Sequence, residues 1–345
     1  MSTNQHQIVR FAVVGVGHIG RRHIEMISRN SMAKLVAICD VDEMRTQDYQ
    51  HLCSIYDSID LLLSNTSELD VVCICTPNGL HIDQAKKVIE AGFHVVVEKP
   101  MGLSKESCGQ LLQSSLDADK KVFCVMQNRY SPPSQWAKKM MSSGRIGDLY
   151  SVHINCLWNR DDRYYLDDTG QRKGWRGSLD MDGGPLFTQF SHFIDVLYWI
   201  FGDVTNIKAQ FQNFKHAHST DFEDSGQILF EFEKGGMGSI NYTTAVYDAN
   251  MESSMTVVGS KGSFKIGGQY MNEVSYCHVQ DYDLEELRPV NPANDYGLYK
   301  GSAANHGYVI QNVIDVLKND QPITTNAFQG LKVVEIIQQI YALRR

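Results

Sequence analysis

The first third of the chain alternates short apolar runs with segments that carry apolar residues at helical spacing. The runs show no polar alternation, which is typical of strands buried on both faces of a parallel sheet. Strands and helices that alternate in this way predict a doubly wound α/β domain. The expected strands are Ile8–Val14, Leu35–Cys39, Val71–Cys75, Val95–Val97 and Lys121–Cys124, and the expected helices are Ile19–Arg29 and His81–Ala91.

The rest of the chain has a different pattern. Short, partly alternating segments bounded by turn signals predict a large open, mainly antiparallel sheet, with strands at Ser225–Phe232, Met237–Thr244, Glu252–Val258 and Gly262–Ile266. Helices are expected at Ser134–Ser143, Leu186–Phe201, Tyr308–Lys318 and Phe328–Leu343. With 345 residues the chain is long enough for two domains. We expect the α/β domain over residues 1–124 and an α+β domain over 125–345, whose last helix is a candidate to pack back on the first domain.

Composition narrows the class of protein. Hydrophobic residues at 43% and charged residues at 21% are globular values, and the net charge of −8 offers no basic surface for nucleic acid or an anionic membrane. No apolar run is long enough to span a membrane, and the polar start Met1–Gln7 has no signal-peptide core, so we expect a cytoplasmic protein. The eight cysteines are scattered without a C-x-x-C pair, which predicts reduced thiols and no metal site.

A glycine-rich turn follows the first expected strand. In Gly15-Val16-Gly17-His18-Ile19-Gly20, Gly15 allows the tight turn, Gly17 lets the backbone approach a pyrophosphate, and Gly20 lets helix and strand pack closely. The helix N-terminus then presents backbone amides to the phosphates. The motif predicts a Rossmann-type dinucleotide-binding domain.

An acidic residue stands where such a domain holds the adenosine ribose. Asp40 ends the second expected strand, twenty residues beyond Gly20, and a carboxylate there accepts hydrogen bonds from ribose hydroxyls. Its charge repels a 2′-phosphate, so we expect NAD rather than NADP. Asp42 is near enough to share this role, and a solvated turn explains either acid without a ligand.

Two further polar segments follow expected strands at the carboxyl edge of the sheet. Thr76-Pro77-Asn78, with His81, suits contacts to the nicotinamide half of the cofactor, although a helix cap explains Asn78 as well. Glu98-Lys99-Pro100 follows Val95–Val97. Proline keeps Lys99 out of the α region, so we expect its side chain to point to the crevice, where a lysine can share a proton with a substrate hydroxyl.

These segments, together with Gly183-Gly184, His192 and Asp195, resemble the Gfo/Idh/MocA oxidoreductases over essentially the whole chain. The resemblance implies an NAD-binding first domain, a second domain that binds substrate and forms homodimers or tetramers, and hydride transfer between nicotinamide and a sugar or cyclitol carbon. It also implies that Lys99 and His192 are catalytic. Oxidation of an alcohol needs a proton acceptor within hydrogen-bond reach. We assign His192 as the base and Lys99 as its hydroxyl-orienting, proton-sharing partner, with an exchange of the two roles left open.

Four segments are similar to a narrower branch, the WlbA/WbpB-type dehydrogenases: Gln127–Pro132, Asn155–Arg160, Lys173–Gly177 and Thr188. Thr188 stands four residues before His192, where many family members have Asp, so this position supplies no aspartate to a proton relay. The similarity implies oxidation of the 3-hydroxyl of UDP-N-acetylglucosaminuronic acid to a ketone, in the nucleotide-sugar biosynthesis of cell-surface polysaccharides. For some members it also implies 2-oxoglutarate as the reoxidant of tightly held NADH.

A nucleotide-linked uronate carries a carboxylate and a diphosphate, which guanidinium groups and backbone amides bind. Arg160, Arg163 and Arg176 lie among aromatic residues and suit this task, while an exposed interaction loop is the alternative. The expected cofactor-binding residues are Gly15, Gly17, His18, Ile19, Gly20, Asp40, Thr76, Asn78, His81, Glu98, Lys99 and Gln127. The expected substrate-binding residues are Lys99, Asn128, Tyr130, Arg160, Arg163, Trp175, Arg176, Thr188, Gln189, His192, Ser302, Asn305 and His306. The last three precede an expected helix whose N-terminus is a candidate phosphate site, and helix capping is the alternative explanation for Asn305.

Two other functions fit parts of this pattern. A dehydrogenase of inositol or a free sugar would not need the arginines to meet a diphosphate. A non-enzymatic, NAD-sensing regulator uses the same fold, but it would have no need of the proton-transfer groups Lys99 and His192.

Overall fold

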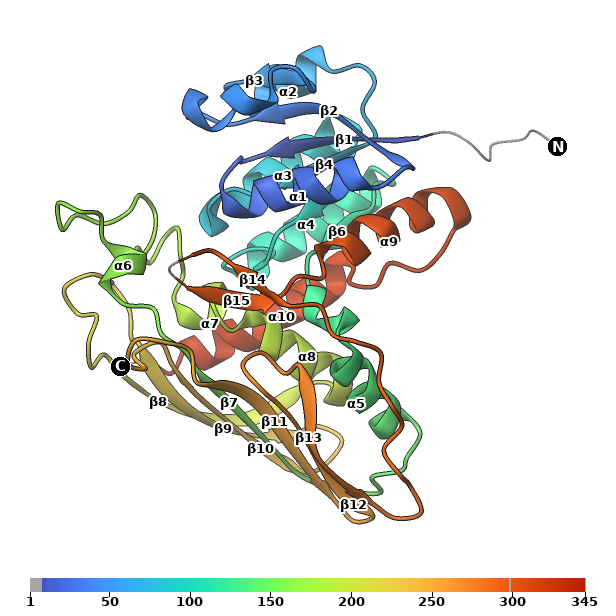
Figure 1. The fold of residues 1–345 in the computed structure, drawn as a ribbon, viewed down its shortest axis with the longest axis vertical. Coiled ribbons are helices and arrows are strands. Elements are labelled where there is room, and N and C mark those ends of the chain that lie inside the picture. The colour runs from blue at the N-terminus through green and yellow to red at the C-terminus, as the bar shows by residue number, and fades with distance from the viewer. Residues whose placement is uncertain (1–7, 298, 345) are drawn as a thin grey trace. The chain divides into compact units, whose positions relative to one another are not determined.

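The computed structural model describes residues 8–297 and 299–344 (Figure 1). The chain forms two compact units, and each is assembled from separate stretches of sequence. The first unit comprises the N-terminal part up to Met126 together with His306–Val334. The second comprises Gln127–Asn305 and the C-terminal part from Glu335. Helix α10 (Ala327–Tyr341) contributes residues to both.

The first unit contains a six-stranded parallel sheet in the order β3-β2-β1-β4-β5-β6. The strand order reverses between β1 and β4, which is the place where ligands bind in doubly wound folds. The strands are β1 (Val9–Val14), β2 (Ala33–Cys39), β3 (Ser54–Tyr56), β4 (Val71–Ile74), β5 (His94–Val97) and β6 (Val122–Cys124). The other elements are α1 (His18–Arg29), η1 (Glu43–Arg45), η2 (Gln47–Tyr49), α2 (Ile59–Asn65), η3 (Asn78–Leu80), α3 (His81–Glu90), α4 (Lys105–Asp117) and α9 (His306–Asn319).

The central strands of this sheet are apolar on both faces because helices cover both. Strand β4 is buried along its whole length, and so is β5 after its first residue. Figure 1 shows helices on both sides of the sheet. The predicted Rossmann-type architecture is confirmed.

The second unit is built on a seven-stranded sheet in the order β13-β12-β11-β7-β10-β9-β8. Strands β7 and β10 pair in parallel, and the other neighbours are antiparallel. The strands are β7 (Leu149–Leu157), β8 (Val204–Gln212), β9 (Ser225–Phe232), β10 (Met237–Thr243), β11 (Glu252–Gly259), β12 (Gly262–Gly267) and β13 (Glu273–Val279), and the hairpin β14 (Ala293–Asp295) and β15 (Lys300–Ala303) lies apart. The remaining elements are η4 (Gln127–Tyr130), α5 (Pro132–Ser142), α6 (Asp162–Tyr165), α7 (Pro185–Thr188) and α8 (Ser191–Phe201).

This sheet is covered on one face. Along β9 every second residue is buried, from Gly226 to Phe232, and the residues between them are exposed. Helices α5 and α8 pack together, and α5 also packs against β12 (Figure 1). This alternation is typical of antiparallel sheets with one face packed on the core and the other exposed to solvent. The predicted mainly antiparallel sheet is confirmed.

One predicted helix is wrong in its extent. The expected helix Leu186–Phe201 consists of two, α7 and α8, with Gln189 and Phe190 between them. Strands β3, β7, β8, β13, β14 and β15 and helices α2, α4 and α6 were not predicted. In the described part of the chain, no helix combines the length and apolar character needed to cross a membrane.

Candidate active site

The glycine turn between β1 and α1 leaves no room for side chains where the motif requires none. Gly15 has a φ of +89°, and a Cβ on it would stand 2.7 Å from the carbonyl oxygen of Cys75. A Cβ on Gly20 would stand 1.8 Å from the Gly15 carbonyl oxygen, so this glycine is needed for the helix to pack. A Cβ on Gly17 would have no neighbouring atom within 4 Å. This open side at a helix N-terminus fits a dinucleotide pyrophosphate.

Asp40 follows β2 and is buried beside the same turn. Its Oδ2 accepts a hydrogen bond from the backbone N–H of Val16 at 2.7 Å, and its Oδ1 accepts one from Asp42 at 2.9 Å. The guanidinium of Arg45 lies 3.7 Å from Oδ2. Asp40 therefore fixes the turn, and its assignment to the adenosine ribose stays a prediction.

His81 joins the segment after β4 to the segment after β5. Its Nδ1 is 2.7 Å from the carbonyl oxygen of Pro100, and its Nε2 is 2.9 Å from that of Thr76. Burial lowers the pKa of His81, although both carbonyl contacts raise it. Asn78 is buried at the start of η3. These contacts hold Thr76 and the Lys99-Pro100 segment, whose peptide bond is cis, in one arrangement at the carboxyl edge of the sheet.

In the second unit, His192 lies on α8 and contacts η4. Its Nε2 is 3.2 Å from the amide nitrogen of Gln127. From the same short helix, Arg129 forms two hydrogen bonds with Asp195, one turn after His192, at 2.8 and 2.6 Å. Both members of this ion pair are buried, and the bidentate geometry fixes η4 against α8. The arrangement positions His192.

Thr188, four residues before His192, contacts a buried aspartate. Its hydroxyl donates to the Asp182 carbonyl oxygen at 2.9 Å and also contacts the Asp182 carboxylate. The other oxygen of this carboxylate accepts the Gly177 N–H at 2.9 Å. The structure thus brings a buried aspartate onto the threonine from a different part of the chain. Sequence reasoning missed Asp182, and its place directly before Gly183-Gly184 was the available signal.

Arg160 is the centre of a polar and aromatic cluster. It is 2% exposed and donates to Gln189 Oε1 at 3.0 Å, to Asn250 Oδ1 at 3.2 Å and to the Lys300 carbonyl oxygen at 3.0 Å. Its guanidinium carbon lies 4.8 Å from the centre of the Trp158 ring and 4.7 Å from that of Tyr299. Hydrogen bonds to neutral acceptors and aromatic faces stabilise this cation without neutralising it.

The other predicted arginines differ from Arg160. Arg163 is exposed and pairs with Asp161 at 2.7 Å and with Asp248 at 3.4 Å. Arg176 is half-buried, with its guanidinium carbon 4.9 Å from the centre of the Tyr164 ring, and Gln189 donates to the hydroxyl of the same tyrosine. The structure therefore brings Arg160, Gln189 and Arg176 together around Tyr164.

The remaining predicted substrate residues lie in several places. Asn128 is buried, and neither polar atom of its amide has a partner among the described residues, so it is available to a ligand. Asn305 donates to the Gln127 carbonyl oxygen and to Ser131, which is a structural task. Ser302 is buried on β15, Tyr130 and Trp175 are half-buried, and His306 belongs to the first unit.

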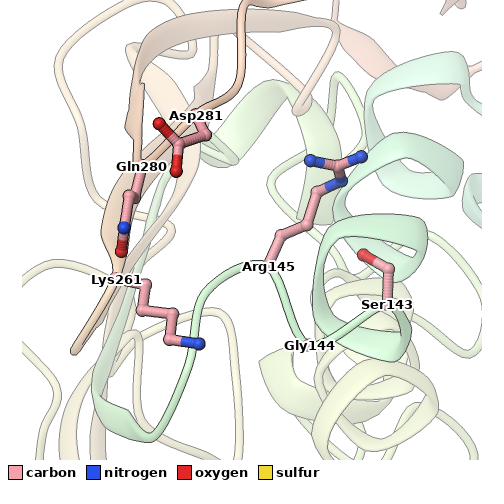
Figure 2. A pocket seen from close by; sticks show the side chains of 6 residues that line it. All are labelled: Ser143, Gly144, Arg145, Lys261, Gln280 and Asp281. Carbon is pink, nitrogen blue, oxygen red and sulfur yellow. The ribbon is translucent and has the colours of Figure 1, made fainter.

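A shallow hollow of about 400 Å³ lies elsewhere on the second unit. Figure 2 shows its polar lining, which comes from the loop after α5 and from two turns of the sheet. The lining residues are Ser143, Gly144, Arg145, Lys261, Gln280 and Asp281. None of them is a predicted site residue.

A parallel sheet with a glycine turn at its switch point, followed by a second sheet, is an architecture that nicotinamide-dependent oxidoreductases use. The family model described as an oxidoreductase family with an NAD-binding Rossmann fold matches residues 9–126, and that of the Gfo/Idh/MocA C-terminal domain matches residues 134–265. Inositol 2-dehydrogenase of Rhizobium meliloti is 30% identical over 95% of this chain and 94% of its own length. The chain therefore belongs to the Gfo/Idh/MocA family, and its cofactor is NAD.

Solved structures show the same similarity. The WlbA dehydrogenase from Bordetella pertussis, in complex with NADH and UDP-GlcNAcA, has a TM-score of 0.86 and 30% identity, covering 98% of this chain and 96% of that one. The WlbA dehydrogenase from Chromobacterium violaceum, with the same two ligands, has a TM-score of 0.86 and 30% identity over 99% of this chain and 94% of that one.

Proposed function

We propose that this chain oxidises the 3-hydroxyl of UDP-N-acetylglucosaminuronic acid to a 3-keto sugar, with reduction of NAD. The observation that carries the proposal is Arg160, a buried cation whose described hydrogen-bond partners are all neutral. A carboxylate or diphosphate of the substrate would supply the missing negative charge. The two WlbA structures, similar over nearly the whole chain, contain this sugar nucleotide and NADH.

Side chains of the protein would accept the proton of the substrate hydroxyl. NAD supplies the hydride acceptor, so the carbon loses a hydride and the hydroxyl loses a proton as the C–O bond becomes a carbonyl. We assign the proton to His192, with Lys99 orienting the hydroxyl and sharing it. The Gln127 amide nitrogen lies 3.2 Å from Nε2 of His192, and Nε2 would accept the proton of the substrate hydroxyl once that hydroxyl takes the place of the Gln127 amide.

A second candidate is the oxidation of inositol or a free sugar. The inositol 2-dehydrogenase of Rhizobium meliloti favours it, since it matches 95% of this chain at 30% identity. Such a substrate carries no anionic group and would leave Arg160 uncompensated.

The test compares substrates on protein freed of bound nucleotide. NAD is added with UDP-N-acetylglucosaminuronic acid, UDP-N-acetylglucosamine or myo-inositol, and NADH absorbance and the product mass are recorded. We expect NADH and a product two hydrogens lighter from the uronate alone. Turnover of myo-inositol without turnover of the uronate would establish the second candidate, and equal turnover of both UDP-sugars would contradict the role of the carboxylate.

A further inference from the structure

Three buried titratable side chains form a cluster in the first unit. Glu98 Oε1 lies 2.9 Å from Nε2 of His23 and 3.5 Å from Nε2 of His306. The two imidazole rings meet edge to face, with centroids 5.6 Å apart. All three side chains are at least nine-tenths buried. The sequence predicts Glu98 at the cofactor and His306 at the substrate, and it predicts no role for His23.

The cluster connects three elements that are distant in sequence. His23 lies on α1, the helix that begins at the glycine turn, and His306 is the first residue of α9, which packs against α1. Glu98 directly follows β5. Its second oxygen, Oε2, accepts a hydrogen bond from the backbone N–H of Lys99 at 3.1 Å. One carboxylate therefore joins both helices to the backbone of the predicted catalytic lysine.

The surroundings of Glu98 favour its ionised form. Burial raises the pKa of Glu98, but the hydrogen bond with His23 and the nearby imidazole of His306 bring it well below its usual value. Burial lowers the pKa of His23, whereas the neighbouring Cys75 and Cys73 and the Glu98 carboxylate raise it well above its usual value. The pKa of His306 is lowered by its burial. Glu98 is therefore held as a carboxylate, and its Oε1, 2.9 Å from Nε2 of His23, has a close partner that fixes its position.

We propose that Glu98 is a positioning residue that fixes Lys99 relative to α1, with His23 and His306 holding its carboxylate in place. The proposal rests on the proposed function, in which Lys99 shares the proton of the substrate hydroxyl. Because α1 begins where the cofactor pyrophosphate binds, Glu98 sets the distance from the Lys99 side chain to the cofactor. A displacement of about 1 Å at a reacting group can cost on the order of 100-fold in rate.

The same three residues have ligand atoms within 4.8 Å of one another, as a metal site would. Two observations favour a hydrogen-bonded cluster. Oε2 of Glu98 is already used by Lys99, and the 2.9 Å between His23 and Glu98 is shorter than the roughly 3.3 Å between ligands of a tetrahedral zinc ion with bonds of about 2.0 Å. Metal analysis of the purified protein is therefore part of the test.

The experiment is a double-mutant cycle with Glu98→Ala and Lys99→Met, read by single-turnover NADH formation and by NAD affinity. We expect Glu98→Ala to slow hydride transfer roughly 10- to 100-fold in the wild-type background. In the Lys99→Met background the same change should cost less than about twofold, because residues that act as a unit are not additive. NAD affinity should stay within about threefold, since both oxygens of Glu98 are bonded within the protein and the glycine turn is untouched. A larger loss of NAD affinity would mean that Glu98 contacts the cofactor, as the sequence predicts, and would overturn the positioning role.

Two further variants show whether the effect comes from the lost hydrogen bond and allow the experiment to be done if Glu98→Ala does not fold. Glu98→Gln keeps an acceptor oxygen for the Lys99 N–H and should restore most of the rate that Glu98→Ala loses. If Glu98→Ala does not fold, His306→Gln weakens the same carboxylate anchor and should show the same non-additive pattern with a smaller effect. Asp70→Asn is the matched control, because it breaks an ion pair with Arg10 at the amino end of the sheet and should leave hydride transfer unchanged.

The outcomes separate the two proposals. An equal fold-loss from Glu98→Ala in both backgrounds, with Lys99→Met itself slow, would overturn the positioning role and leave the proposed function standing. Wild-type rates in Lys99→Met would contradict the proposed function instead. One equivalent of metal per chain, with activity lost on chelation, would also overturn the hydrogen-bonded cluster.

Discussion

The carboxylate of Asp40 accepts a hydrogen bond from the backbone N–H of Val16 at 2.7 Å, across the turn that the dinucleotide fold uses for its pyrophosphate. Asp40, the residue predicted to select NAD over NADP, thus also shapes the turn that binds the cofactor. A substitution at Asp40 consequently changes both the cofactor preference and the shape of the turn. Separate variants are needed to distinguish these two effects.

Cofactor preference is the first prediction. A 2′-phosphate beside Asp40 places like charges together, which costs on the order of a few kcal/mol, so NAD should bind far more tightly than NADP. Asp40→Ser should narrow this gap. Asp40→Asn keeps an oxygen for Val16 and loses only the charge, so it should narrow the gap with a smaller loss of NAD affinity. Equal dissociation constants for the two cofactors in the unmodified protein would refute the prediction.

Proton transfer is the second prediction. Lys99→Met and His192→Asn should each slow hydride transfer by about a hundred- to ten-thousand-fold, the usual contribution of general acid–base groups. The double variant should fall little below the slower single one. NAD affinity, measured by fluorescence titration, should be nearly unchanged. A rate within a few-fold of wild type for either single variant would remove that residue from the mechanism.

Recognition of the substrate anion is the third prediction. Arg160→Lys keeps a charge but loses the planar donors, and a hydrogen bond between charged groups contributes about 1.5–3 kcal/mol, so KM for the uronate should rise roughly 10- to 100-fold. Arg163→Lys is the control. Arg163 is exposed and already paired with Asp161, so its KM should change less than about twofold. Similar KM values for the two variants would exclude a special role for Arg160.

Recycling of the cofactor is the fourth prediction, and it comes from the resemblance to the WlbA/WbpB-type branch. If NADH stays bound, purified protein should contain it, and 2-oxoglutarate should oxidise it to NAD with formation of 2-hydroxyglutarate. Loss of NADH absorbance and the mass of the hydroxy acid measure the two halves of this exchange. Protein that is isolated without nucleotide and turns over with free NAD would show that recycling in place does not occur.

The pH dependence of stability is the fifth prediction. Burial raises the pKa of Asp70, but its bonds to Arg10 outweigh this and lower it below the ordinary value of 3.8. A lowered carboxyl pKa gives stability above the unfolded pKa, and this is lost as pH falls through the folded value. Asp70→Asn should therefore lower the melting temperature at neutral pH, and the difference should shrink as pH falls below about 4. A constant difference over this range would contradict the ion-pair account.

Local patterns allowed much of the first unit to be predicted. Buried parallel strands are continuously apolar, and the glycine turn requires particular residues at fixed spacing, so both are readable from neighbouring positions. Strand β9 was predicted with its observed limits because alternation and turn residues mark its ends. Strand β3 has three residues, too few for a periodic signal.

The site contacts were harder to predict because distant residues form them. Arg129 and Asp195 are 66 positions apart, and nothing near Arg129 indicates that a carboxylate will meet it. Asp182 and Thr188 meet across a chain segment that contains Gly183-Gly184, both with positive φ. The break between α7 and α8 is likewise absent from the apolar spacing, which continues through Gln189 and Phe190.

The first unit is not continuous in sequence, and this has a consequence for synthesis of the protein. Translation delivers the glycine turn, Asp40 and Lys99 early, but His306 and helix α9 only after the whole antiparallel sheet has been made. Until then the Glu98 carboxylate lacks one of its two imidazole neighbours. A nascent chain released before residue 306 would therefore contain the glycine turn that binds the dinucleotide. It would still lack His306, one of the two imidazoles beside the carboxylate that bonds the backbone of Lys99.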